Sequence, residues 1–199
     1  MCCVQTSNTT PITGAGTITY GLISFDTFAP TISTTTQNET TTRYGVLAST
    51  KQPAFSAYLP STDANVTGDA SVYTFGGVTD LTEIFDQGGD FDNSTGIFTT
   101  PISGRFLFNG VAYMGGILST HTNGYVQLTT SNRNYSSLTL APSKVFNVST
   151  NMQLDLTHIA DMDVGDTAQF QVQMNNGTKV VDALGAASPD SVFSGYMLC

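Results

Sequence analysis

The chain has 199 residues, of which 11% are charged and 40% hydrophobic, and its 12 Phe and 8 Tyr exclude a chain that is disordered throughout. Six Lys and Arg against fifteen Asp and Glu give a net charge of −9, which argues against a nucleic-acid partner, and no apolar run is long enough for a membrane-spanning helix. Because Thr, Val and Gly favour strands and tight turns over helices, we expect an all-β protein.

Residues 1–51 are dominated by Thr and contain few large apolar side chains, which predicts an extended N-terminal arm. The arm lacks the Gly repeat of collagen and the heptads of a coiled coil. Two islands, Thr17 to Phe28 and Tyr44 to Ala48, have the alternation of a strand that pairs with another sheet. In the first island, the side chains that we expect to dock on a partner are Ile18, Tyr20 and Leu22.

Cys2, Cys3 and Cys199 lie at the ends of the chain, which excludes an internal disulfide framework. We interpret Cys2 and Cys3 as free thiols, with acylation or an interchain bridge as the alternatives.

The first residues lack the pattern of a signal peptide, so synthesis in the cytoplasm is expected. We attribute seven Asn-x-Ser/Thr sequons to composition rather than to glycosylation. They begin at Asn8, Asn38, Asn65, Asn93, Asn134, Asn147 and Asn176.

Residues 52–199 contain short apolar runs separated by Gly, Asp and Asn, a pattern typical of a β-sandwich. Alternation is clear where Phe170, Val172 and Met174 face away from the intervening Gln residues. No segment has helical periodicity with caps, so few and short helices are expected. Strands are predicted near 54–59, 71–75, 81–86, 96–100, 105–114, 124–130, 136–140, 152–159, 167–174 and 192–198.

One spaced set of residues identifies a family. An acid is followed by aromatics five and twelve positions later, then by a Gly and two further aromatics at alternate positions. These residues are Asp86, Phe91, Phe98, Gly104, Phe106 and Phe108. The set resembles the globular head domain of complement component 1q and its relatives in the tumour-necrosis-factor superfamily. The segment Pro53 to Ala57 resembles the opening strand of that family, and Phe193, Gly195 and Tyr196 resemble its closing strand.

Two positions depart from the family pattern. Asp80 stands where the signature opens with Phe, and Gly110 stands where it closes with an aromatic residue. We expect both departures to loosen the packing around them without changing the fold.

The resemblance implies a ten-stranded jelly-roll sandwich that assembles as a homotrimer and acts as a recognition head rather than an enzyme. The segment Asn65 to Asp69 resembles the versions of this domain found in bacteriophage fibres and bacterial surface proteins. We therefore expect a virion structural protein, a trimeric fibre or appendage head at the virion surface that contacts a host receptor or glycan. Capsid, portal or tail proteins would hold residues 1–50. The alternative is a bacterial surface or spore-coat protein that uses the same head for assembly or adhesion.

Candidate chemistry is sparse. His121 lies in a loop without a nearby carboxylate in sequence, and His158 is interpreted as a residue on the exposed face of a strand, so catalysis is not expected. The resemblance makes calcium the cofactor to consider, and oxygen-rich loops suit this ion. We prefer the interpretation that the acids stabilise turns or belong to the family pattern, so that no metal or other cofactor is expected. The two acidic sets are Asp86, Asp90 and Asp92, and Asp161, Asp163 and Asp166.

Overall fold

The computed structural model describes residues 40–43, 46–49, 52–137, 141 and 150–198. The chain divides into two compact units, Met1–Gln52 and Pro53–Cys199. In the first unit, strands β1 (Thr40–Arg43) and β2 (Val46–Ser49) pair antiparallel, with Thr40 opposite Ser49. The sequence predictions for Ile18, Tyr20, Leu22, Cys2, Cys3 and Cys199 concern residues outside the described ranges.

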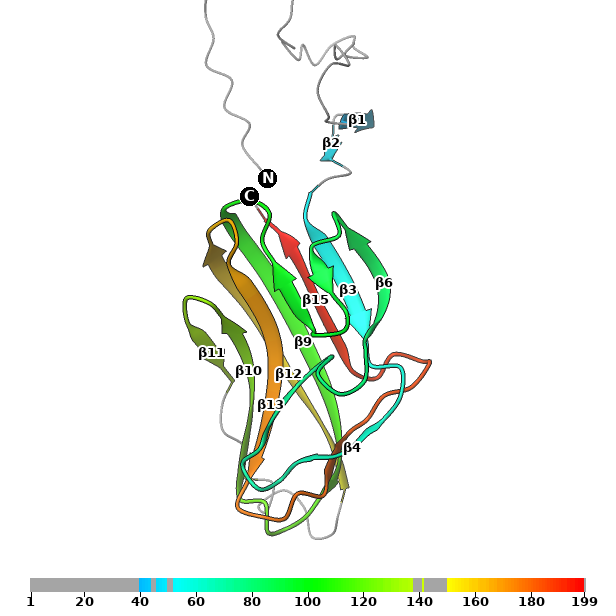
Figure 1. Cartoon of the computed structure of the whole chain (residues 1–199), viewed down its shortest axis with the longest axis vertical. Helices are drawn as coiled ribbons and strands as arrows, with labels where there is room; N and C mark the ends of the chain where they lie inside the picture. Colours follow the sequence, from blue (N-terminus) through cyan, green and yellow to red (C-terminus); the bar gives the residue numbers. More distant parts are fainter. Residues whose placement is uncertain (1–39, 44–45, 50–51, 138–140, 142–149, 199) are drawn as a thin grey trace, which may run out of the picture. The chain divides into compact units, whose positions relative to one another are not determined.

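The second unit is a jelly-roll-like sandwich of two antiparallel sheets (Figure 1), so the all-β prediction is confirmed for the described residues, among which no helix occurs. The six-stranded sheet contains β11 (Asn134–Ser136), β10 (Asn123–Thr130), β13 (Thr167–Asn175), β8 (Ile97–Thr99), β7 (Phe91–Asp92) and β5 (Val72–Thr74). The seven-stranded sheet contains β4 (Asp63–Thr67), β14 (Val181–Ala183), β9 (Gly104–Ile117), β15 (Val192–Met197), β3 (Ala54–Tyr58), β6 (Thr82–Gln87) and β12 (Thr150–Met162). Within the described ranges, no helix could cross a membrane.

The prediction of ten strands is wrong in number, because the sandwich also contains the short strands β4, β7 and β14. Strand β7 has two residues and β14 has three, which is too few for a pattern of alternation. The two long strands extend beyond their predicted ends: β9 has 14 residues and β12 has 13, and they pair along most of their length. The remaining predicted strands occur near their expected positions.

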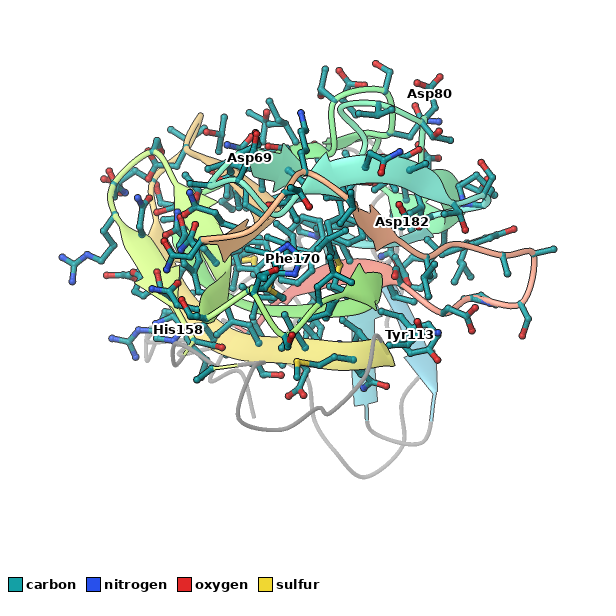
Figure 2. All side chains as sticks on the ribbon, turned by 90° about the horizontal axis from the view of Figure 1, so that it is seen from below. Asp69, Asp80, Tyr113, His158, Phe170 and Asp182 are labelled. Carbon is teal, nitrogen blue, oxygen red and sulfur yellow. The ribbon has the colours of Figure 1, made fainter. Side chains whose placement is uncertain are left out.

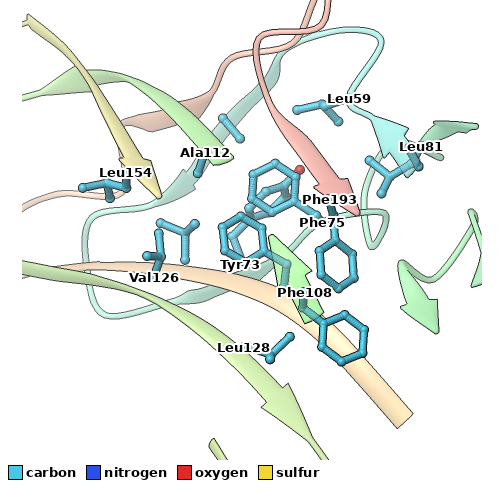
Figure 3. Close-up of a cluster of buried hydrophobic side chains, with 14 of the residues drawn as sticks. Leu59, Tyr73, Phe75, Leu81, Phe108, Ala112, Val126, Leu128, Leu154 and Phe193 are labelled. Carbon is cyan, nitrogen blue, oxygen red and sulfur yellow. The ribbon is translucent and has the colours of Figure 1, made fainter. Parts of the chain in front are cut away.

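The core between the sheets is built largely from Phe rings (Figure 3). Phe55 of β3 stacks on Phe91 with the ring centroids 4.4 Å apart, and its ring lies 5.1 Å from that of Phe98. Phe193 of β15 meets Phe55 edge to face at 5.0 Å. Such pairs contribute about 0.5–1.5 kcal/mol each beyond the area that they bury. The aromatic signature therefore supplies the side chains that join the two sheets.

Strand β13 shows how the sequence pattern directs side chains. Phe170, Val172 and Met174 are fully buried, while the intervening Gln residues face outward, as the alternation predicts. Phe170 lies in the interior of the sandwich in Figure 2. The same rule holds in β12, where Leu154 is buried and Asp155 is exposed.

Candidate interaction surface

The signature acid Asp86 is the penultimate residue of β6, and it holds the turn that follows the strand. Its carboxylate accepts the backbone N–H groups of Asp90 at 3.3 Å and Phe91 at 3.1 Å. This fixes the entry into β7, where Phe91 turns into the core. In the closing strand, a Cβ on Gly195 would lie 2.6 Å from Cδ1 of Phe108, so only Gly allows this ring to pack against β15. Tyr196, the next residue, faces outward.

The two departures from the signature differ in their consequences. At Gly110 the expectation of loose packing is wrong, because the ring of Phe170 from the opposite sheet occupies the space that a Cβ would fill. Phe170 is itself 1% exposed. The aromatic bulk that is missing from β9 is therefore supplied by β13. Asp80 lies exposed in the loop before β6, at the periphery of the sandwich (Figure 2).

The outward face of the seven-stranded sheet carries several exposed apolar side chains among polar ones. In one cross-strand row, Ile159 of β12 stands beside Leu107 of β9, which stands beside Tyr196 of β15. Ile159 is 50% exposed and Tyr196 is 47% exposed. Phe85 of β6, on the same face, is 50% exposed. Single exposed apolar residues are ordinary, but Ile159, Leu107 and Tyr196 form a continuous row across three adjacent strands, and Phe85 lies on the same face beyond β3.

A groove of about 530 Å³ lies between the β10–β11 hairpin and β12. Tyr135 and His158, whose ring centroids are 3.9 Å apart, line this groove. The interpretation of His158 as an exposed strand residue is wrong, since its side chain is partly buried against Tyr135. Arg133 and Asp161 also line the groove.

His121 is fully buried, which its Gly- and Asn-flanked loop did not indicate. The N–H of Leu118 donates to Nδ1 at 2.9 Å, so in the neutral ring the proton is on Nε2, which donates to the carbonyl of Thr178 over 3.0 Å. The ring thus joins the loop after β9 to the loop after β13. Gly68 lies against this ring, and a Cβ there would meet Nε2 at 2.9 Å.

In the second acidic set, Asp166 and Asp161 make polar contacts with residues nearby in the fold. Asp166 accepts from the Ser131 hydroxyl at 2.7 Å, from Asn132, and from the Asp163 N–H at 2.7 Å, and these bonds lower its pKa, that from Asp163 most. Asp161 lies 3.9 Å from the Arg105 guanidinium. Within the described ranges, no three of His, Cys, Asp and Glu converge as metal ligands.

Asp63 is a buried carboxylate that the sequence did not single out. It is 3% exposed and accepts from the Tyr73 hydroxyl at 2.7 Å and from the Thr79 hydroxyl at 2.5 Å. Burial, and next the hydrogen bond to Asp63, raise the pKa of Tyr73 well above its ordinary value. This network fastens the loop before β6 to β4.

Residues 54–198 match the family model described as the C1q domain. Among solved structures, the chain is similar to the globular domain of zebrafish complement 1qA protein, with 21% identity, a TM-score of 0.50, and coverage of 74% of this chain and 98% of that one. It is also similar to the PRD1 vertex protein P5, with 10% identity, a TM-score of 0.51, and coverage of 84% and 85%. No curated protein matches. The family resemblance predicted from Asp86 to Phe108 is thereby confirmed.

Proposed function

Because the chain belongs to the C1q domain family, we propose that it is a trimeric recognition head carried on a virion and not an enzyme. In this proposal, residues 53–199 form the head of a fibre or appendage on a phage or related virus. Residues 1–51 anchor the head to a capsid, portal or tail protein, and the head contacts the host surface.

The main support for a trimer is the set of exposed apolar side chains on the outward face of the seven-stranded sheet. Ile159, Tyr196 and Phe85 are about half exposed in the isolated subunit. Burial of such side chains against another copy is favourable by about 25 cal/mol for each Å² of apolar surface removed from water. Closed rings of identical subunits are a common way to cover a patch of this kind. A further copy of the chain is therefore the occupant that we propose for this face.

The proposed virion context has a separate support. The chain is similar in fold to a protein whose title is vertex protein P5 of PRD1, over 84% of its own length. At 10% identity this similarity concerns the fold, and the placement on a virion is our inference.

Light scattering at micromolar concentration tests the assembly. We expect a mass three times the 21.0 kDa of one subunit. Replacing Tyr196 by Lys should lower the mass, because a charge would be buried in the interface. The matched control is Val78→Lys, which alters an exposed apolar residue in a loop and should leave the mass unchanged. A folded wild-type monomer would contradict the trimer.

Mass spectrometry tests whether the protein is part of a virion. We expect the chain in purified virions of the source and not in envelopes of uninfected cells. Detection in uninfected envelopes or spore coats would instead support a bacterial surface or spore-coat protein.

A further inference from the structure

The outward side chains of β5, β10 and β13 in the six-stranded sheet are uncharged and, apart from Val72 and Tyr125, polar. Strand β10 presents Tyr125, Gln127 and Thr129 outward, and β13 presents alternating Gln residues. Along β5, β10 and β13, all of which the structure describes, the outward side chains include no Lys, Arg, Asp or Glu. The lack of charge on these three strands stands out in a chain with a net charge of −9.

A chain of hydrogen bonds crosses this face. The Ser136 hydroxyl donates to Oε1 of Gln127 at 2.8 Å, and Nε2 of Gln127 donates to the Thr129 hydroxyl at 2.7 Å. The Thr129 hydroxyl donates to Oε1 of Gln171 at 2.8 Å, and Nε2 of Gln171 donates to the Thr74 hydroxyl at 2.9 Å. The bonds link four strands, β11, β10, β13 and β5.

These bonds orient the amides without exhausting them. A Gln amide has two N–H donors and an oxygen with two lone pairs, and Gln171 uses one donor and one lone pair in the chain. The same holds for Gln127. Each amide therefore keeps a donor and an acceptor for a ligand, in an orientation that the neighbouring strands fix. Fixed side chains lose less entropy when a ligand binds.

We propose that this face binds an uncharged glycan. Sugar hydroxyls are both donors and acceptors, which matches a row of oriented amides and hydroxyls. The absence of basic residues from the outward positions of β5, β10 and β13 gives an acidic glycan no counter-charge. Tyr125 lies on the same face, one pair beyond Gln127 along β10, and its ring adds an apolar surface for a sugar ring. This inference specifies the chemical class of receptor that the proposed attachment head would bind. Its biological meaning rests on the proposed function.

Electrophoresis of the full chain through native gels that contain dissolved polysaccharide tests the proposal. The neutral probes are dextran, mannan and galactan, and the acidic probe is alginate. We expect at least one neutral probe to retard the protein and alginate to have no effect. Gln171→Ala should weaken the affinity about three- to tenfold, the effect of losing a neutral hydrogen bond, and Gln127→Ala/Gln171→Ala should abolish retardation.

The matched control is Val78→Ala, which alters an exposed loop residue that belongs to neither sheet and should leave retardation unchanged. Circular dichroism of each variant checks that the fold is retained. The proposal is overturned if no neutral probe retards the wild type, if alginate alone does, or if the Gln171 variants bind like the wild type. Absence of the chain from virions would overturn the attachment role and leave a positive gel result standing.

Discussion

The ring of Phe170 lies where a side chain on Gly110 would begin. The two residues come from different sheets, since Gly110 belongs to β9 and Phe170 to β13. Phe170 also stacks on Phe193 with the centroids 5.8 Å apart, and Phe193 pairs with Gly110 in the neighbouring strand. A small residue in one sheet thus accommodates a large one from the other.

Gly110→Ala is therefore expected to destabilise the head by about 1–3 kcal/mol, because the added methyl group would overlap the Phe170 ring. Urea unfolding of the two proteins measures the difference. Gly110→Ala/Phe170→Leu should recover part of the loss relative to the two single changes, as residues in contact are coupled. Strictly additive effects would show that the two residues do not share this space.

The sequence predicted the fold well where a pattern repeats. Alternation in β13 was sufficient because it has the two-residue period of a strand with one buried face. The spaced aromatics between Asp86 and Phe108 were sufficient because they match a family pattern, and all four rings are buried. The family assignment followed from the second pattern and is confirmed by the match over residues 54–198.

The sequence could not predict which side chains from different elements meet. Phe170 fills the space at Gly110 from 60 residues away, and Asp63 of β4 meets Tyr73 of β5 although the two strands lie in different sheets. His121 lies in a loop, as expected, but its complete burial and its bond to the Thr178 carbonyl had no signal in the sequence. Side-chain contacts that cross the sandwich leave no pattern within a single segment of the sequence.

Tyr73→Phe is expected to destabilise the head by about 1–3 kcal/mol, because the Asp63 carboxylate loses a buried donor. Asp63→Ala should cost more, since it leaves the hydroxyls of both Tyr73 and Thr79 without their acceptor. Thermal or urea unfolding compares the variants. A smaller loss for Asp63→Ala than for Tyr73→Phe would contradict this network.

The raised pKa of Tyr73 also predicts a dependence on alkaline pH. In the unfolded chain, Tyr loses its proton near pH 10, whereas the folded protein retains it at higher pH. Stability from this residue is present below about pH 10 and declines as the pH rises further. The free energy of unfolding, measured from pH 8 to 11, should fall more steeply for the wild type than for Tyr73→Phe. Parallel profiles would show that Tyr73 does not contribute.

His121→Ala is expected to destabilise the head by about 1–3 kcal/mol, because the Leu118 N–H and the Thr178 carbonyl lose their buried partner. Hydrogen exchange measures the effect locally: protection should fall in residues 118–122 and 176–180. The control is His158→Ala, which alters the partly buried ring against Tyr135 and should leave exchange in those two loops unchanged. Unchanged exchange in the His121 variant would refute the connection between the loops.

The last prediction concerns residues 1–51. This segment has too few large apolar side chains to fold alone. Its two alternating stretches nevertheless predict a binding role rather than a flexible leader. In a trimer, three copies of this segment would bind the virion together. Once the first copy has bound, binding of the other two is intramolecular, so a modest affinity of each copy gives near-permanent attachment. A head that begins at Gln52 should remain soluble and trimeric but fail to enter virions, measured by mass spectrometry of purified particles. Replacing Ile18, Tyr20 and Leu22 by Ser in the full chain should weaken incorporation in the same direction, because strand addition needs their apolar side chains. Normal incorporation of the truncated head would show that it attaches through another surface.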